Sequence, residues 1–302
     1  MVSCFSYYIL MRKTIALCIC SVLICILAFG ICLKKINREG FTVKSEEYQT
    51  ILELWNIDTF EGGTGSRKDF LLKTGAKYEK KHKGVIVSVI NYTPLGAKQA
   101  LKTKVPDMVS CGAGMDFFIP YLNSISFSSN YKTVNLGKKS YGIAWCYGVY
   151  VLIGGGNKNL AVGQGEYNNP LKHYDIKGYE SVKTYSPYSA YSEFLKGKCD
   201  LLGTQRDLYR LSNKGVEFEY KVLDEYSDLA QNMLITTQNK KNFTYCESFL
   251  SYMLTEEVQS RLGEIGLLPV KKTGIYKDGV LERAEKVEIK KFSSFFDYKQ
   301  KQ

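Results

Sequence analysis

The stretch VIVSVINYTPLGAKQALKTKVPDMVSCGAGM, residues 85–115, places a β-branched run, a helix-forming run and a second apolar run in sequence. Residues 85–92 have the composition of a strand, and Thr93 followed by Pro94 is a typical helix start. Residues 107–115 predict a further strand that runs into a glycine-containing loop. A strand, a helix and a strand joined by short connections indicate a parallel sheet with right-handed crossovers.

The preceding stretch, ILELWNIDTFEGGTGSRKDFL at residues 51–71, extends this pattern toward the N-terminus. It predicts a strand, a glycine-rich turn and a helix that begins after Ser66, with Asp69 completing an acidic capping box. Ligands of parallel sheets lie beyond the carboxyl ends of the strands. The loops at 57–66 and 111–116 both lie at that edge, so the topology predicts a binding site there.

The later chain predicts a second group of elements with weaker periodicity between them. The run SYGIAWCYGVYVLIGGG, residues 140–156, predicts one or two strands in a different sheet. The other expected elements are helices at 188–198 and 205–215, strands at 199–204, 216–223 and 228–238, and two helices after Asn239 followed by a last segment near 278–296.

Residues 14–33, TIALCICSVLICILAFGICL, form a run of twenty uncharged and mostly apolar residues between basic flanks. This length suffices to span a bilayer, which predicts either an uncleaved membrane anchor or a signal peptide cleaved after Gly30, in which case the protein would be secreted. A buried core helix is the alternative. A lipoprotein signal is disfavoured because Ile precedes both Cys25 and Cys32.

Charge and cysteine content limit the function classes. The net charge is +11, and the six basic and one acidic residues among 1–45 contribute much of it. The remaining lysines are scattered, without the aromatic-interleaved basic stripe that nucleic-acid binding requires. Outside the N-terminal region the cysteines lack CxxC spacing, and they predict buried free thiols, with one disulfide as the alternative. They are Cys111, Cys146, Cys199 and Cys246.

Motifs for catalysis are missing from the sequence. The turn GGTGSRK matches neither phosphate-loop spacing, and neither G-x-S-x-G nor H-E-x-x-H occurs. His82 and His173 are the only histidines, which leaves little material for a triad or a zinc site. The sequence therefore predicts a protein that is not an enzyme and needs no cofactor.

Four blocks in fixed order carry a resemblance to a known family. They are residues 51–56 with KKHKGVIVSVINYT and PDMVSCGAGM, then KKSYGIAWCYGVYVLIGGGNKNL, FLKGKCDLLGTQRDLYRL and ESFLSYMLTEEVQSRLGEIGLLPV. Together they cover most of residues 50–270 and are similar to extracellular solute-binding proteins of ABC importers, family 1 type. The chain departs from that pattern in lacking most of the helical middle of the second lobe, at residues 157–187.

The resemblance implies a two-lobed α/β fold of the type II periplasmic-binding-protein kind, each lobe a sheet flanked by helices. Residues 1–45 would be the signal or anchor and linker, and the remaining parts follow in order: 46–125 as the first part of lobe 1, 126–228 as a reduced lobe 2, and 229–302 as the return to lobe 1 with the C-terminal helices. A monomeric protein at the extracellular face of the membrane would bind a small polar solute between the lobes and deliver it to permease subunits. Carbohydrates are the leading expectation, with polyols and glycerol phosphates as related ligands. The alternative is a membrane-anchored sensor or accessory protein with a degenerate solute-binding fold.

The candidate ligand contacts follow from the strand ends and from the resemblance. Aromatic faces would stack on a sugar, and amide, carboxylate and guanidinium groups would bind its hydroxyls. For each residue the alternative is a cap, a turn or the core. The candidates are Asn56, Asp58, Thr59, Glu61, Ser66, Gly112, Gly114, Trp145, Tyr147, Gln205, Arg206, Tyr226 and Asp228.

Overall fold

The computed structural model describes residues 49–126, 133–136, 138–224, 226–271, 279–287, 289 and 291–292, together with Ser21 and Ile24. The predicted anchor or signal segment at 14–33 thus lies, apart from those two residues, outside the described residues. No helix in the described part of the chain is long and apolar enough to cross a membrane. Both large sheets belong to one compact unit that begins at Gln49.

The first sheet is built around a parallel core. Strand β1 (Thr50–Ile57) pairs in parallel with β2 (Val85–Tyr92) on one side and with β3 (Met108–Cys111) on the other. Helices α2 (Arg67–Lys81) and α3 (Pro94–Ala100) connect the three strands. The predicted β-α-β-α-β order is confirmed, and the loops after β1 and β3 end at the same edge.

Antiparallel strands complete this sheet beyond β3. Strand β12 (Gln231–Ile235) pairs with β3, β5 (Lys139–Tyr147) pairs with β12, and the short strands β4 (Thr133–Leu136) and β13 (Leu268–Pro269) both pair with β5. The return strand predicted at 228–238 is therefore β12. Its first residue lies at the ligand-side edge, because β12 runs opposite to β1 and β3.

Local capping explains where the two connecting helices begin. The Ser66 hydroxyl accepts a hydrogen bond from the Asp69 backbone N–H at 3.1 Å, and the Thr93 hydroxyl accepts one from the Gly96 N–H at 3.1 Å. Each cap satisfies a backbone donor that the helix leaves unpaired. Helix α2 ends at the predicted position, with His82 as its C-cap residue.

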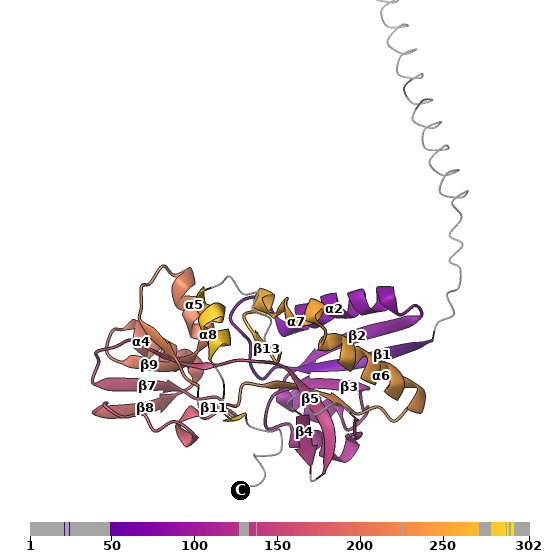
Figure 1. Ribbon diagram of the computed structural model, residues 1–302, viewed down its shortest axis with the longest axis horizontal. Coiled ribbons are helices and arrows are strands. Elements are labelled where there is room, and N and C mark those ends of the chain that lie inside the picture. The colour runs from indigo at the N-terminus through magenta and orange to yellow at the C-terminus, as the bar shows by residue number, and fades with distance from the viewer. Residues whose placement is uncertain are drawn as a thin grey trace, which may run out of the picture. The chain divides into compact units, whose positions relative to one another are not determined.

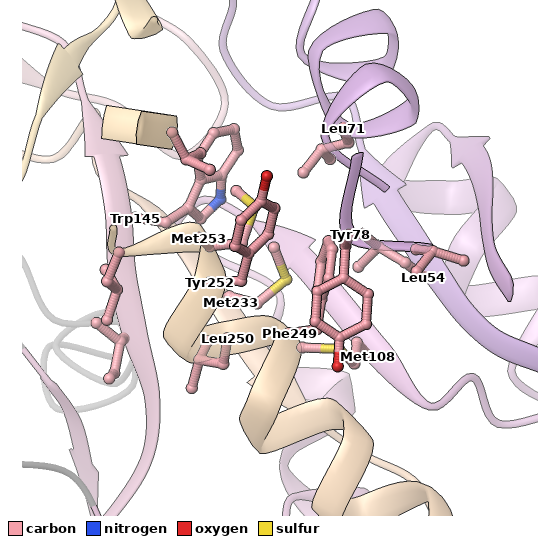
Figure 2. Close-up of a cluster of buried hydrophobic side chains, with 14 of the residues drawn as sticks. Leu54, Leu71, Tyr78, Met108, Trp145, Met233, Phe249, Leu250, Tyr252 and Met253 are labelled. Atoms are coloured by element: carbon pink, nitrogen blue, oxygen red, sulfur yellow. The ribbon is translucent and has the colours of Figure 1, made fainter. Parts of the chain in front are cut away.

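The side chains of β1 alternate between the two faces of the first sheet, and both faces are covered by helices. Leu52 and Leu54 pack with α2 and with α6 (Lys240–Met253), whereas Trp55 and Ile57 pack with α3 and the 3₁₀ helix η1 (Asp116–Tyr121). Figure 1 shows α2 and α6 lying over the strands of this sheet. The core on the α2 face contains Tyr78, Trp145, Phe249 and the methionines drawn in Figure 2.

The second sheet has five strands in the order β10-β6-β9-β7-β8. Its parallel strands β7, β8 and β9 lie side by side in Figure 1, with α4 packed against β7 and β9. The bounds are β6 (Tyr150–Ile153), β7 (Asn159–Gly163), the 3₁₀ helix η2 (Pro170–Lys172), β8 (Ser181–Tyr185), α4 (Pro187–Leu195), β9 (Asp200–Thr204), α5 (Gln205–Asn213) and β10 (Tyr220–Val222).

Strand β5 corrects one sequence-based expectation. Residues 140–156 were expected in a sheet different from the first, which is right for β6 and wrong for β5. Strand β5 joins the first sheet because β12, some ninety residues later in the chain, supplies its hydrogen-bonding partner. The boundaries expected for the lobes remain a prediction, although β4 and β5 pair within the first sheet.

The C-terminal part contains shorter elements than the sequence suggests. Helix α6 is confirmed, but the second expected helix is divided into α7 (Glu256–Gln259) and the 3₁₀ helix η3 (Leu262–Ile265), with Gly266 in the left-handed region after it. Helix α8 (Gly279–Lys286) follows, and strand β14 (Lys291–Phe292) pairs with β11 (Tyr226–Ser227).

Candidate functional site

A buried polar cluster lies where β1, β3 and β12 meet the loop 57–66. The Thr59 hydroxyl donates to the Gln231 side-chain carbonyl at 2.9 Å and accepts from the Gly112 N–H at 3.1 Å. A Cβ atom at position 112 would lie 2.8 Å from the Thr59 Oγ1 atom. Gly112 is therefore required for the close approach of the two loops that the topology placed together.

Arg67, the first residue of α2, lies at the centre of this cluster with no exposed surface. Its Nη1 group donates to the Gln231 Oε1 atom and its Nη2 group donates to the Ile57 carbonyl at 3.0 Å. The Glu61 carboxylate lies 3.4 Å from Arg67 Nε and also accepts from the Arg67 backbone N–H at 3.1 Å. We call Thr59, Glu61, Arg67, Gly112 and Gln231 the Arg67 cluster.

Three buried polar atoms in and beside the Arg67 cluster have no hydrogen-bond partner within the described structure. They are Arg67 Nε, Gln231 Nε2 and Asn56 Oδ1. Exchanging the oxygen and nitrogen of the Gln231 amide would not give it more hydrogen bonds, because its Oε1 atom already accepts from both Thr59 and Arg67. Leaving such groups unpaired costs roughly 1–3 kcal/mol each. Such groups bind water, an ion or polar ligand atoms, and Thr74, Tyr191 and Arg261 each have one elsewhere, so it is the position at the strand ends that favours a ligand here.

Asn56 and Asp58 belong to a hydrogen-bonded row along the adjacent strand β2. The Asn56 amide donates to the Asn91 carbonyl oxygen at 2.6 Å, and the Asn91 amide donates to the Asp58 carboxylate at 2.7 Å. Asp58 is exposed, whereas Asn56 is fully buried and pairs in register with Ser110 on β3. The structure thus brings Asn56, Thr59, Glu61 and Gly112 to one strand-end edge.

Helix α5 meets the loop 57–66 from the second sheet. A Cβ atom at Gly63 would lie 2.9 Å from Arg206 Cα and 2.9 Å from the ring of Tyr209. Arg206 is partly buried and makes neither a hydrogen bond nor an ion pair within the described part of the chain. Burial, and secondarily the neighbouring Arg210, lower the pKa of the Arg206 guanidinium. The group stays charged, since the ordinary pKa of arginine is far above neutral.

Gln205 serves a connecting role. Its side-chain carbonyl accepts from the Val149 N–H at 2.9 Å, and its amide donates to the Gly266 carbonyl at 3.3 Å. These bonds join the start of α5 to the end of β5 and to the turn after η3. Gln205 is fully buried and has both functional atoms occupied, which favours a structural function over ligand contact.

Phe60, which the sequence analysis did not select, packs in two hydrophobic clusters. One is the core of the first sheet and the other surrounds Tyr150 on the second sheet. A Cβ atom at Gly148 would lie 2.5 Å from the Phe60 ring. The loop 57–66 therefore places an aromatic side chain between the two sheets beside the Arg67 cluster.

Tyr167 approaches the second loop in a comparable way. Gly114 has φ +84°, and a Cβ atom there would lie 2.0 Å from the Tyr167 ring. Both the left-handed backbone and the ring therefore require glycine. Tyr167, like Phe60, comes from a segment whose sequence gave no sign of the contact.

Trp145 lies away from any exposed surface. Its ring is fully buried, stacks on Phe70 at a centroid distance of 5.9 Å, and its Nε1 group donates to Ser110 Oγ at 3.1 Å. Figure 2 shows it within the core on the α2 face. Tyr147 is also buried, and burial, with a smaller contribution from Glu285, raises its pKa to about 12. The core alternative stated for both residues is the one that these contacts favour.

Tyr226 and Asp228 connect the segment before β12 to β6 and to the segment 168–174 through hydrogen bonds. The Asp228 carboxylate accepts from the Tyr150 hydroxyl at 2.5 Å and from the Asn169 N–H at 3.0 Å, and its backbone carbonyl accepts from the Asn168 amide at 2.9 Å. We call these four residues the Asp228 cluster. Burial raises the pKa of Asp228. Tyr226 bonds through its backbone to the Tyr174 hydroxyl.

Sequence reasoning missed Arg67, Gln231, Phe60 and Tyr167. Arg67 is the first residue of α2, a position where a charged side chain is ordinarily expected to be exposed to solvent. Gln231 is the first residue of the return strand, and that position was the available signal, because polar residues at strand ends face the ligand edge. Ser66, by contrast, is occupied as the cap of α2.

An open hollow of about 970 Å³ lies elsewhere, lined by the end of α5, the segment before β10, and α8. Its walls include Glu217, Phe218, Glu219 and Arg283, the last lying over the ring of Tyr220. None of the candidate contacts lines it. The strand-end position and the unpaired buried atoms make the Arg67 cluster the stronger candidate site.

The four cysteines outside the N-terminal region agree with the expectation from the sequence. Cys111, Cys146, Cys199 and Cys246 are free and buried, which confirms the free-thiol prediction over the disulfide alternative. Burial raises the pKa of each thiol. Within the described ranges, no group of three or more acidic, histidine or cysteine side chains could hold a metal ion.

Comparison with solved structures shows the fold. The sugar-binding protein MalE from Xanthomonas citri superposes with a TM-score of 0.59 at 12% identity, covering 81% of this chain and 86% of that one. The MalE domain from Bdellovibrio bacteriovorus bound to maltotriose gives 0.56 at 11% identity over 83% and 90%. Iron-bound HitA from Pseudomonas aeruginosa gives 0.52 at 13% identity over 76% and 89%. The chain thus has the two-lobed α/β fold of type II periplasmic binding proteins.

No family model matches the sequence, and no curated protein matches it. The structural neighbours include proteins named for sugars and one named for iron, at identities of 11–13%. The likeness therefore establishes the fold but leaves the ligand to be argued from the residues of this chain.

Proposed function

We propose that this protein is a solute-binding component of an ABC importer that captures a small polar solute between its two lobes. The solute would contact the Arg67 cluster from the first sheet and the start of α5 from the second. The observation that carries the proposal is the set of unpaired buried atoms, Arg67 Nε, Gln231 Nε2 and Asn56 Oδ1, at the strand-end edge. Hinge motion between lobes is the ordinary way in which such a fold admits a ligand.

The neighbours named for maltotriose and other sugars support a carbohydrate or a related polyol as the solute. Among the candidate contacts, Asn56, Asp58, Thr59, Glu61, Gly112 and Gly114 stay in the proposed site with Arg206. Phe60 and Tyr167 would supply the apolar faces that sugar binding uses. Trp145, Tyr147, Gln205, Tyr226, Asp228 and Ser66 act as core, connecting or capping residues.

Delivery to permease subunits, a monomeric state and tethering at the extracellular face by residues 14–33 complete the proposal. The lobes would be residues 46–125 with 229–302, and 126–228, apart from the strands that pair with the first sheet. No cofactor and no catalytic group enters it.

A ligand screen by thermal unfolding tests the proposal. The full chain, purified in detergent, is heated with oligosaccharides, monosaccharides, polyols and their phosphates. We expect a saturable rise in Tm with at least one solute, because a ligand that binds only the folded state stabilises it by mass action. The variant Gln231→Leu should lose the rise, whereas Lys158→Ala, in an exposed ion pair with Glu180 on the second sheet, should keep it. A well-folded chain that gives no saturable rise with any solute contradicts the proposal.

A second candidate is a membrane-anchored sensor or accessory protein whose cleft no longer takes a solute. The contact of Phe60 with both hydrophobic clusters favours it, since that ring already fills space between the sheets. Replacing Phe60 by Ala distinguishes the two. A solute-binding protein that stacks its ligand on Phe60 should lose affinity in this variant. In a sensor with a filled cleft, neither the wild type nor the variant should respond to a solute, and the variant should only lose stability.

A further inference from the structure

The electrostatic composition of the Arg67 cluster and of α5 points to a more specific ligand chemistry. Arg67 and Arg206 approach the loop 57–66 from the two sheets, Arg67 through Glu61 and Arg206 through its contact with Gly63. Glu61 neutralises Arg67, and Asp207 pairs with Arg210 at 3.1 Å. The guanidinium of Arg206 therefore makes no ion pair among the described residues, and the carboxylates near enough to act on its charge, Asp207 and Glu61, are paired with other arginines.

The unpaired buried atoms indicate which ligand atoms would be bound beside this positive charge. Gln231 Nε2 is a fully buried donor without a partner, whereas Arg67 Nε, which also makes no hydrogen bond, faces the Glu61 carboxylate at 3.4 Å. Arg206 also lies in the first turn of α5, a nine-residue helix, where backbone N–H groups create a partial positive charge. An unpaired donor, a free guanidinium and a helix start together match the oxygen atoms of an anion. Asn56 Oδ1 is the exception, an acceptor that suits a hydroxyl group.

We propose that the solute of this site carries an anionic oxygen group, a phosphate or a carboxylate, on a hydroxylated carbon skeleton. The anion is bound between the Arg206 guanidinium and the Gln231 Nε2 donor, and a hydroxyl of the skeleton donates to Asn56. This inference rests on the proposed solute-binding function and narrows its ligand class from neutral carbohydrates to sugar phosphates, polyol phosphates or sugar acids.

The negative groups in and beside the site are Asp58, Glu61 and Asp207. The exposed Asp58 carboxylate accepts a hydrogen bond from the Asn91 amide at 2.7 Å, and the other two are engaged as well. Glu61 binds Arg67 through both oxygens, and Asp207 binds the Thr204 N–H at 3.0 Å as well as Arg210. Neither carboxylate is available to pair with Arg206. An anionic ligand would thus meet an attractive field rather than a balanced one.

Matched pairs of neutral and anionic solutes test the inference by isothermal titration calorimetry on the full chain in detergent. The pairs are glycerol with glycerol 3-phosphate, and glucose with glucose 6-phosphate and glucuronate, with inorganic phosphate alone as a further probe. We expect the anionic member to bind at least about tenfold tighter than its neutral parent, because charge-assisted hydrogen bonds exceed neutral ones. The phosphate and carboxylate arms then distinguish the two sources of the anion.

Three variants assign the preference to the site. Arg206→Gln should reduce it at least about tenfold, and it should remain folded because Arg206 has no partner to lose in the described structure. Gln231→Glu should also abolish it, since the new carboxylate would pair with Arg67 and repel an anion. Arg283→Gln removes the same charge from α8 and should leave the preference unchanged.

The outcomes separate this inference from the proposed function. Tight binding of neutral sugars with equal or weaker binding of the anionic partners overturns the anion site and leaves solute binding intact. An anion preference that Arg206→Gln does not alter also overturns it, since the charge then acts from elsewhere. Absence of binding in every arm overturns both.

Discussion

The Arg67 cluster and the Asp228 cluster each bury a charged side chain, but they differ in how their partners are arranged. Asp228 accepts hydrogen bonds on both carboxylate oxygens and on its backbone carbonyl from Tyr150, Asn169 and Asn168. Arg67 leaves its Nε atom without a hydrogen bond, and its partner Gln231 leaves Nε2 unpaired. A fully partnered charge fixes a loop to a sheet, whereas an incompletely partnered one has capacity left for a ligand.

The two clusters also differ in the sheet elements that they connect. The Asp228 cluster fixes the segment after β7 to the strand β6, although Asp228 itself lies only three residues before Gln231, in the segment that leads into β12. The Arg67 cluster joins α2, β12 and the loop after β1, where parallel strands end together. Position at a strand end and incomplete hydrogen bonding coincide there, and the combination separates a candidate site from a structural contact.

The largest expected effect comes from Asp228→Ala. The change removes the acceptor of Tyr150 and of the Asn169 N–H, and two buried donors without partners destabilise the fold by about 3 kcal/mol. Urea denaturation followed by circular dichroism measures the loss. Asp228→Asn, which keeps the size and one acceptor, should cost less. A loss below about 1 kcal/mol for the alanine variant would show that the cluster is not a structural support.

A smaller stability effect is expected for Arg67→Met, which replaces the guanidinium with an apolar chain of similar length. The change relieves the desolvation of a buried charge but leaves the Ile57 carbonyl, Gln231 and Glu61 without their donor, so we expect a loss of about 2 kcal/mol. Solute affinity should nevertheless be lost. A loss of stability as large as that of Asp228→Ala, with affinity retained, would make the Arg67 cluster structural and remove the contrast.

The smallest expected effect is a pH dependence. The pKa of Asp228 is raised above its ordinary 3.8 by burial, so the folded state holds this proton more tightly than the unfolded chain. Stability from this group therefore falls as pH rises from the ordinary pKa through the folded one, and is constant above it. Asp207, whose pKa burial also raises, contributes with the same sign.

The contribution of Asp228 is measured as a difference between proteins. Free energies of unfolding are determined from about pH 4 to about pH 7 for the wild type and for Asp228→Asn, which has no proton to lose. The wild-type minus variant difference should decrease with rising pH. The lowered pKa values of Glu193, Glu257 and Glu282, each bonded to a lysine, act in the opposite direction but cancel in the difference. A difference that rises with pH would mean that Asp228 folds as a charged group.

Sequence alone determined the elements whose signals are local. The strands at 51–56 and 85–92, the caps Ser66 and Thr93, and the parallel order of the first three strands were all predictable, because periodicity and capping act within a few residues. The edge at which the site lies followed from the same topology. Of the candidate contacts, those in the loops after β1 and β3 lie together as expected.

Only the tertiary structure decided which sheet receives β5, that Trp145 is core, and that Arg67 with Gln231 forms the polar centre of the candidate site. Each depends on partners distant in sequence, since β5 needs β12 and Arg67 meets Gln231 across 164 positions. A tryptophan and an arginine carry the same residue-level signals whether they face a cleft, a core or solvent. The packing of α2 and α6 against the sheet resolves that choice, because it fixes which side chains lose contact with water.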